Sequence, residues 1–146
     1  MPPPAEEPNA PATVLVVDDT PLNLLVARGL LERRCGVVVD GAGGGEEALA
    51  KIASGKRYAA IFMDQLMPGL DGVETMQKIR ALSASPDAEL ATYAGGVPII
   101  ALTADTTAGN EATFIRRGFQ GFLSKPINIK TLTDLVDKWV RKTINN

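Results

Sequence analysis

The chain has 146 residues, of which 45% are hydrophobic and 22% charged, and its formal net charge is −2 at pH 7. These values are typical of a single globular domain, and they give no basic footprint for direct nucleic-acid binding. One cysteine and no histidine are present, which excludes an internal disulfide, a histidine-ligated metal site and a phosphohistidine. No apolar run approaches the ~20 residues that span a membrane, so we expect no membrane association and a cytoplasmic location.

The N-terminal segment 1–12 differs from the rest of the chain in composition. It holds five of the ten prolines, which exclude a regular helix or a central strand there. We interpret it as a disordered tail or linker that precedes one domain at 13–144. It carries acidic residues and proline where a secretory signal would have basic and apolar residues.

From residue 13 onward, short apolar runs alternate with helical patterns. A helix beginning at Pro21 is indicated by Leu22, Leu25, Val26, Gly29 and Leu30 at helical spacing, and proline suits a first turn. In chain order the pattern predicts a strand at 13–17, the helix from Pro21, a strand at 37–39, a loop at 41–45, a helix at 46–54, a strand at 59–63, a loop at 64–71, a helix at 72–82, a long connection at 83–96, a strand at 98–102, a helix at 106–117, a strand at 121–123 and a helix at 129–143. The connection 83–96 is polar and rich in small residues, which favours a loose loop over a partner-specific insertion.

Strands that alternate with helices predict an α/β fold with a parallel sheet covered on both faces. We expect a doubly wound sheet of five strands in the order 2-1-3-4-5, with five helices and right-handed crossovers. The switch point of this topology lies between the first and third strands, and ligands of such sheets bind at their carboxyl edge.

Polar residues follow four of the five predicted strands at that edge. Asp18 and Asp19 follow the first strand, Asp64 the third, Thr103 the fourth and Lys125 the fifth. Three crowded carboxylates repel one another unless a cation lies between them. The sequence therefore predicts a pocket for Mg²⁺ and a phosphoryl group.

Each residue type has a chemical role in such a pocket. The carboxylate of Asp64 can attack phosphorus and form an acyl phosphate. Asp18, Asp19 and Asp64 can bind Mg²⁺ together with a backbone carbonyl from the loop after Asp64. Lys125 can pair with Asp64 or with the phosphoryl group, and Thr103 can donate a hydrogen bond to a phosphoryl oxygen. Taken singly, each of these residues also suits an ordinary helix cap or turn.

The motifs together resemble a known family. Val16-Val17-Asp18-Asp19, Met63-Asp64-Gln65-Leu66-Met67-Pro68, Leu102-Thr103-Ala104 and Leu123-Ser124-Lys125-Pro126 are similar to the receiver domain of two-component response regulators, with the CheY-like fold. Among receiver domains, these motifs are most similar to those of receivers attached to hybrid histidine kinases.

The resemblance implies a role for each matching position. Asp64 would be the phosphoacceptor, Asp18 and Asp19 acidic ligands of Mg²⁺, and the Leu66 carbonyl a further ligand. Thr103 and Lys125 would sense the phosphoryl group, and Phe122 would be the switch aromatic. The Lys125–Pro126 bond would be cis. The phosphoryl donor would be a histidine kinase or a histidine phosphotransfer protein. The receiver would either stand alone or be attached to a kinase or effector domain in a longer protein.

Some positions depart from the family pattern. Leu66, two residues after Asp64, cannot orient a hydrolytic water, whereas Asp105 could; from Leu66 we expect slow hydrolysis of the acyl phosphate. The glycine-rich segment 41–45 lacks both a dinucleotide and a P-loop motif. A kinase partner or a small phosphodonor must therefore supply the phosphoryl group, and the chain is not expected to be an independent turnover enzyme.

Two other functions compete with this interpretation. A phosphatase of the haloacid-dehalogenase type would also place an aspartate after its first strand, but it needs a second one two residues later, where this chain has Thr20. A pseudo-receiver that only binds partners is the other alternative, and the intact set of Asp19, Asp64, Thr103 and Lys125 disfavours it. The cognate kinase, the output and the oligomeric state stay open.

Overall fold

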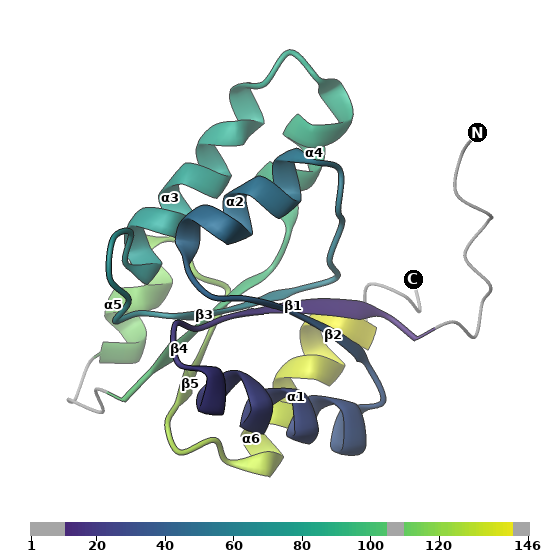
Figure 1. Ribbon diagram of the computed structural model, residues 1–146, viewed down its shortest axis with the longest axis vertical. Helices are drawn as coiled ribbons and strands as arrows, with labels where there is room; N and C mark the ends of the chain where they lie inside the picture. Colours follow the sequence, from purple (N-terminus) through teal and green to yellow (C-terminus); the bar gives the residue numbers. More distant parts are fainter. Residues whose placement is uncertain (1–10, 105–109, 142–146) are drawn as a thin grey trace.

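The computed structural model describes residues 11–104 and 110–141 and has a central sheet of parallel strands with helices on both faces (Figure 1). The predicted strand order is confirmed, because the sheet runs β2-β1-β3-β4-β5. The strands are β1 (Thr13–Val17), β2 (Val38–Ala42), β3 (Ile61–Asp64), β4 (Ile99–Thr103) and β5 (Gly121–Ser124). Crossover helices separate consecutive strands, as parallel pairing requires.

The described residues contain six α-helices, one more than predicted. They are α1 (Pro21–Cys35), α2 (Gly45–Ala53), α3 (Gly72–Ala81), α4 (Ala88–Gly96), α5 (Asn110–Arg117) and α6 (Ile129–Val136). A 3-10 turn at Leu82–Ala84 follows α3, and a π-helical turn at Asp137–Arg141 continues α6. None of the helices in these ranges is long and apolar enough to cross a bilayer.

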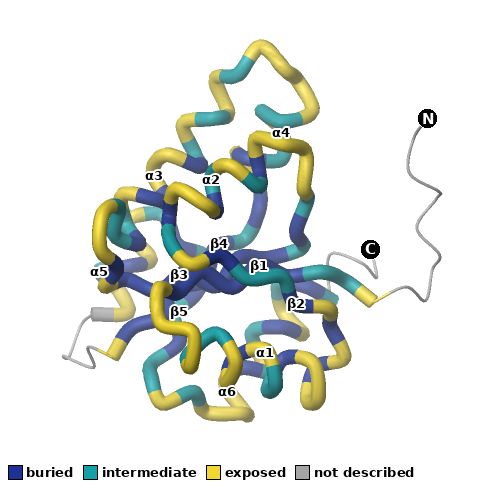
Figure 2. Tube along the Cα trace, in the orientation of Figure 1, coloured by how far each residue is buried: buried dark blue, intermediate teal, exposed yellow. Residues whose placement is uncertain are grey.

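Two apolar cores lie on opposite faces of the sheet. One contains Leu15, Met63 and Ala101 from the strands and packs against α2, α3, α4 and α5; the other contains Val16, Phe62 and Leu102 and packs against α1 and α6. The alternation follows from strand geometry, in which successive side chains point to opposite faces. The strands β1, β3 and β4 are therefore buried along almost their whole length, and β2 and β5 less completely (Figure 2). The polar residues at the carboxyl edge thus lie at the ends of buried strands.

The extra helix α4 overturns the prediction of a loose loop at 83–96. The Asp87 side chain caps the helix, accepting hydrogen bonds from the backbone N–H groups of Glu89 and Leu90. The Tyr93 hydroxyl donates to the Tyr58 carbonyl at 2.9 Å and accepts from the Tyr58 N–H at 2.8 Å. The two hydrogen bonds between Tyr93 and Tyr58 span 35 positions of sequence, so no local pattern in the segment 83–96 predicts them.

Of the apolar stripe that predicted helix α1, Leu30 packs against the core, but the first three residues are exposed. Ala27, Leu31 and Cys35 face the sheet, whereas Leu22, Leu25 and Val26 are 64%, 66% and 50% exposed. Helical spacing indicates a helix but does not decide which of two apolar stripes is turned inward. The sheet therefore leaves an apolar face of α1 open near the end of β1.

Other boundaries shift by a few residues. Strand β2 extends to Ala42, so part of the predicted loop at 41–45 is strand. In the predicted helix 129–143, Leu132, Val136 and Val140 are buried, Ile129 is exposed, and 142–143 lie outside the described residues. The first part of the predicted helix 106–117 and most of the tail 1–12 also lie outside them.

Candidate functional site

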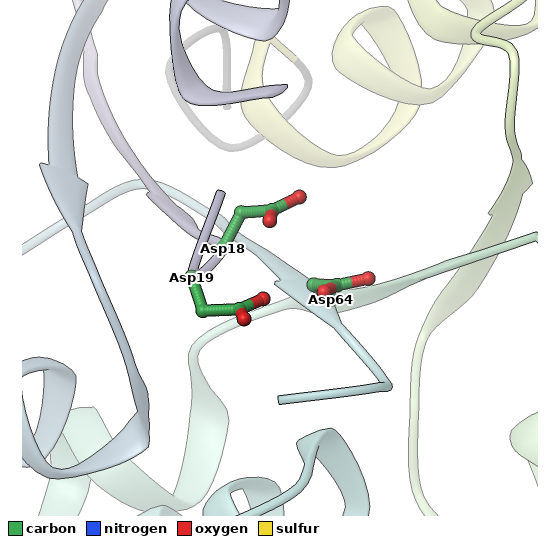
Figure 3. A group of neighbouring side chains, drawn as sticks. All are labelled: Asp18, Asp19 and Asp64. Atoms are coloured by element: carbon green, nitrogen blue, oxygen red, sulfur yellow. The ribbon is translucent and has the colours of Figure 1, made fainter. Parts of the chain in front are cut away.

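Three carboxylates meet where β1 and β3 end. Asp18 and Asp19 directly follow β1, and Asp64 is the last residue of β3. The two strands are paired in register up to Val17 and Met63, which brings the following residues side by side. Oxygen atoms of the three carboxylates lie within 4.8 Å of one another (Figure 3). The sequence prediction that these residues gather at one edge of the sheet is thus met by the geometry.

Lys125 joins this cluster from the position directly after β5, on the other side of β4. Its ammonium Nζ lies 2.9 Å from Asp18 Oδ2 and 2.9 Å from Asp64 Oδ1. The Lys125 backbone N–H donates to the Thr103 carbonyl at 2.8 Å, which fixes the start of its loop. The Lys125–Pro126 peptide bond is cis, as the resemblance implied. One ammonium therefore shares its charge between two buried carboxylates.

Backbone and side-chain donors orient Asp18. Its Oδ1 accepts from the Thr20 N–H at 3.0 Å and from the Asn23 side-chain amide at 3.5 Å. Asp18 is 1% exposed, while Asp19 is more exposed. The contact of Asn23 was not predicted; its position in the first turn of α1, five residues after Asp18, is the signal that could have found it.

Burial and charge crowding shift the ionisation of the site. Burial raises the pKa of Asp64, and the neighbouring Asp18 adds to this, while hydrogen bonds from Lys125 and from the Gln65 backbone oppose it. Burial alone would lower the pKa of Lys125, but its hydrogen bonds to Asp18 and Asp64 outweigh that effect and raise it. Lys125 is thus held as a cation, and Asp64 is a more basic carboxylate than an exposed one.

The remaining predicted residues that the structure describes are Thr103, Phe122 and Leu66. Thr103 ends β4 with 3% exposure and is in register with Ser124, next to Lys125. Phe122 is partly buried in β5, and its ring lies 5.8 Å from that of Phe114 at an interplanar angle of 32°. Leu66 is 79% exposed at the rim. Asp105 lies outside the described residues.

Sequence reasoning missed Gln65 and Gly72. Gln65 is 7% exposed and packs against Gly72, the first residue of α3. A Cβ atom on Gly72 would lie 2.5 Å from the Asp64 carbonyl oxygen and 2.5 Å from Gln65 Nε2. Only glycine leaves room for this contact, and no residue pattern in the sequence reveals it.

The donor set fits a hard divalent cation. All three side chains offer carboxylate oxygens, which are the ligands that Mg²⁺ and Ca²⁺ prefer. Three carboxylates against one ammonium leave the cluster with an excess of negative charge that a cation would neutralise. The cluster could therefore hold a metal ion.

Comparison with known proteins agrees with this geometry. The sequence model of the response regulator receiver domain matches residues 14–137. The chain belongs to this family. Receiver domains act as phosphoacceptors in a phosphorelay. The CheY-like fold of the family matches the fold class predicted from the sequence.

Several relatives are hybrid kinases. The receiver is 34% identical over 133 residues to the sensor protein GacS of Pseudomonas syringae pv. syringae, and 40% identical over 125 residues to hybrid signal transduction histidine kinase E of Dictyostelium discoideum. These alignments cover 91% and 86% of the chain but 14% and 7% of the relatives. The chain is thus homologous to a small part of these kinases.

Solved receiver structures superpose over nearly the whole domain. The receiver domain of sensor histidine kinase PA1611 from Pseudomonas aeruginosa PAO1 has a TM-score of 0.74 and 31% identity, covering 90% of this chain and 99% of that one. That structure has a magnesium ion coordinated in its active site cleft. The chemotaxis protein CheY4 of Vibrio cholerae has a TM-score of 0.71 and 30% identity, with 89% and 99% coverage.

Proposed function

We propose that Asp64 accepts a phosphoryl group from a phosphohistidine in a Mg²⁺-dependent reaction. A carboxylate oxygen of Asp64 attacks phosphorus, the N–P bond breaks, and its electron pair stays on the imidazole nitrogen of the donor. The observation that carries this proposal is the convergence of Asp64 with Asp18, Asp19 and Lys125 at one sheet edge. A nucleophile, cation ligands and a fixed positive charge are the parts that phosphoryl transfer to a carboxylate needs.

Mg²⁺ is the cofactor that we infer for this site. Asp18, Asp19 and Asp64 would hold it, together with the Leu66 backbone carbonyl. When bound, it would supply the charge neutralisation that lets an anionic phosphoryl group approach a carboxylate. The magnesium ion reported for the PA1611 receiver supports the choice of this cation.

Lys125, Thr103 and Phe122 are the proposed readers of the phosphoryl group. Lys125 would exchange its contact with Asp64 for one with a phosphoryl oxygen, and Thr103 would donate its hydroxyl to another. Phe122 would turn inward as Thr103 moves, which would shift an equilibrium between two conformations. Phe122 lies on the strand next to β4, in register with Ala101, so a movement at the end of β4 can reach its ring.

The proposed donor is a histidine kinase or a histidine phosphotransfer protein, because the chain has no histidine of its own. The open apolar face of α1 supports a protein donor. Leu22, Leu25 and Val26 are exposed on the helix that begins three residues after Asp18, and clustered exposed apolar residues mark protein-binding surfaces. An attached kinase or effector domain, and a cytoplasmic location, belong to the same proposal.

A phosphatase function is the weaker alternative. It requires an acidic residue at position 20, where Thr20 instead donates its backbone N–H to Asp18. We therefore propose that the receiver promotes its own phosphorylation and dephosphorylation and is not an independent turnover enzyme.

Incubation with acetyl phosphate and Mg²⁺, read by intact mass, tests the acceptor. We expect a gain of one phosphoryl group that is abolished by EDTA and by Asp64→Asn, and that persists in Asp134→Asn, an exposed carboxylate on α6. If the Asp64→Asn variant is labelled as well as the wild type, Asp64 is not the acceptor. If the folded wild type binds Mg²⁺ but accepts no phosphoryl group from acetyl phosphate or from phosphorylated kinases, it is a pseudo-receiver.

The α1 surface is tested separately. Leu25→Glu is expected to slow transfer from a phosphorylated histidine kinase or phosphotransfer protein while leaving labelling by acetyl phosphate unchanged. Ile115→Glu, which alters another exposed apolar residue on α5, is the matched control. Equal transfer to both variants and to the wild type would exclude α1 as the docking face.

A further inference from the structure

Directly after Asp64, a polar side chain is buried and the apolar side chain that follows it is exposed. Gln65 is a polar residue with 7% exposure, and Leu66 is an apolar residue with 79% exposure. Met63 and Met67, on either side, belong to the apolar core beneath. Burial of an amide at position 65 is therefore compensated only by the hydrogen bonds that its polar atoms make.

Gln65 makes hydrogen bonds to the backbone on both sides of Asp64. Its side-chain Nε2 donates to the Met63 carbonyl at 2.8 Å. Its backbone N–H donates to the Leu102 carbonyl at 3.1 Å, and its own carbonyl accepts from the Gly72 N–H at 3.1 Å. Together these bonds hold three consecutive peptide groups, from residue 63 to residue 66, and the first of them depends on the glutamine side chain.

The other end of the Gln65 amide has no such contact. Oε1 is buried and has no hydrogen-bond partner among the described residues. Reversing the amide would not help, because it would place Oε1 against the Met63 carbonyl, acceptor against acceptor. A buried unpaired acceptor costs folding free energy, and this cost offsets the gain from the Nε2 hydrogen bond to the Met63 carbonyl. The buried amide is therefore a weak source of folding stability.

We propose that Gln65 is a positioning residue for the cation site. This inference rests on the proposed function, in which Asp64 and the Leu66 carbonyl bind Mg²⁺. The side-chain hydrogen bond of Gln65 fixes the peptide between Met63 and Asp64. With the two backbone hydrogen bonds of residue 65, it sets the direction of the Asp64 carboxylate and the path of the chain into Leu66. Mg²⁺ requires near-ideal octahedral geometry, so its affinity depends on how rigidly these two ligands are held.

Gln120 provides a matched control at the opposite edge of the sheet. Its Nε2 donates to the carbonyl two residues earlier, that of Gly118, at 3.0 Å, as Gln65 does to Met63. Its Oε1, unlike that of Gln65, accepts from Arg80 at 2.6 Å and from the Ile99 N–H at 2.8 Å. Gln120 is therefore a structural glutamine, far from the carboxylates.

The test measures Mg²⁺ binding by calorimetry and Tm by thermal unfolding, in the wild type, Gln65→Met and Gln120→Met. Gln65→Met is expected to keep or raise Tm and to weaken the Mg²⁺ Kd roughly tenfold. Gln120→Met is expected to lower Tm and leave Kd unchanged. Gln65→Leu is a second apolar variant, which distinguishes loss of the amide from a folding defect specific to methionine. Mg²⁺ binding is measured well below the Tm of every variant.

The outcomes separate this inference from the function on which it rests. If the wild type binds Mg²⁺ and a folded Gln65→Met or Gln65→Leu binds it with a Kd within twofold of the wild-type value, the positioning role alone is overturned. A folded wild type that binds no Mg²⁺ overturns both. Weaker binding in both Gln65 variants, with Gln120→Met unaffected, supports the proposal.

Discussion

The ammonium Nζ of Lys125 lies 2.9 Å from Oδ1 of Asp64, across 61 positions of sequence. The same ammonium lies 2.9 Å from Oδ2 of Asp18. Lys125 comes from the loop after β5 and reaches past the end of β4 to the first and third strands. This pair of contacts links the loop after β5 to the carboxyl ends of β1 and β3.

Loss of the Lys125 ammonium is expected to destabilise the Mg²⁺-free protein. Lys125→Met leaves two buried carboxylates facing each other, and removing one partner of a largely buried pair typically costs about 3 kcal/mol. Because 22% of the Lys125 side chain is exposed, we expect a loss of about 2–3 kcal/mol in the free energy of unfolding, measured with urea. Saturating Mg²⁺ should recover most of it.

Lys130→Met is the control for that measurement. Lys130 pairs with Asp134 on the surface of α6, where the two side chains are 85% and 64% exposed, and an exposed helical pair contributes about 0.5 kcal/mol or less. Equal losses in the two variants, or a loss in Lys125→Met that Mg²⁺ does not reduce, would contradict the electrostatic role of Lys125.

The raised pKa of Asp64 predicts a pH dependence. Because burial raises this pKa above its ordinary value of 3.8, the folded state binds the proton more tightly than the unfolded state does. Stability from this group is therefore present at low pH and is lost as the pH rises through the folded pKa. Asp64→Asn removes that loss, so it is expected to raise Tm at neutral pH without Mg²⁺, and by less as the solution becomes acidic.

The affinity of the wild type for Mg²⁺ is expected to fall as the pH falls. The ion competes with the proton for Asp64, so its affinity is expected to weaken on acidification at a pH above the ordinary carboxyl value of 3.8. Calorimetric titrations over a pH series measure this, with Asp134→Asn as a control that leaves the midpoint in place. A midpoint at or below the ordinary value would contradict the raised pKa.

The candidate site was predictable from the sequence because of how parallel strands end. Asp18, Asp64, Thr103 and Lys125 each follow or close an apolar run, and in a parallel sheet such positions share one edge. The order of the strands then decides that β1 and β3 are neighbours. The polar residues at the ends of the predicted strands were therefore enough to predict which side chains lie together in the folded protein.

Other features depend on contacts that the sequence does not encode locally. Helix α1 has two apolar stripes, and packing against α6 decides that Leu31 rather than Leu25 is buried. Helix α4 is anchored by Tyr93 to the backbone of Tyr58. Gln65 is buried because Gly72 admits it. Each is a tertiary contact that overrides what residue type alone would suggest.

Gly72 is expected to tolerate no side chain. In Gly72→Ala the new Cβ would lie 2.5 Å from the Asp64 carbonyl oxygen, so the loop after β3 must shift. Overpacking of this kind costs about 1–3 kcal/mol, and we expect weaker Mg²⁺ binding as well, measured by urea unfolding and calorimetry. Gly44→Ala is the control, since no heavy atom lies within 4 Å of its added Cβ; the same behaviour in both variants would contradict the close approach.

Leu66 is expected to prolong the acyl phosphate on Asp64. Its exposed apolar side chain at the rim offers no hydrogen bond to an attacking water. Leu66→Asn adds one, and a net contribution of about 1.4 kcal/mol in the transition state corresponds to roughly tenfold faster hydrolysis. Decay of the phosphorylated mass in Mg²⁺, after the donor is removed, measures the rate. Leu66→Ala adds no polar group and should not reproduce the effect; a wild-type half-life of seconds, or equal acceleration by alanine, would show that Leu66 does not protect the phosphoryl group.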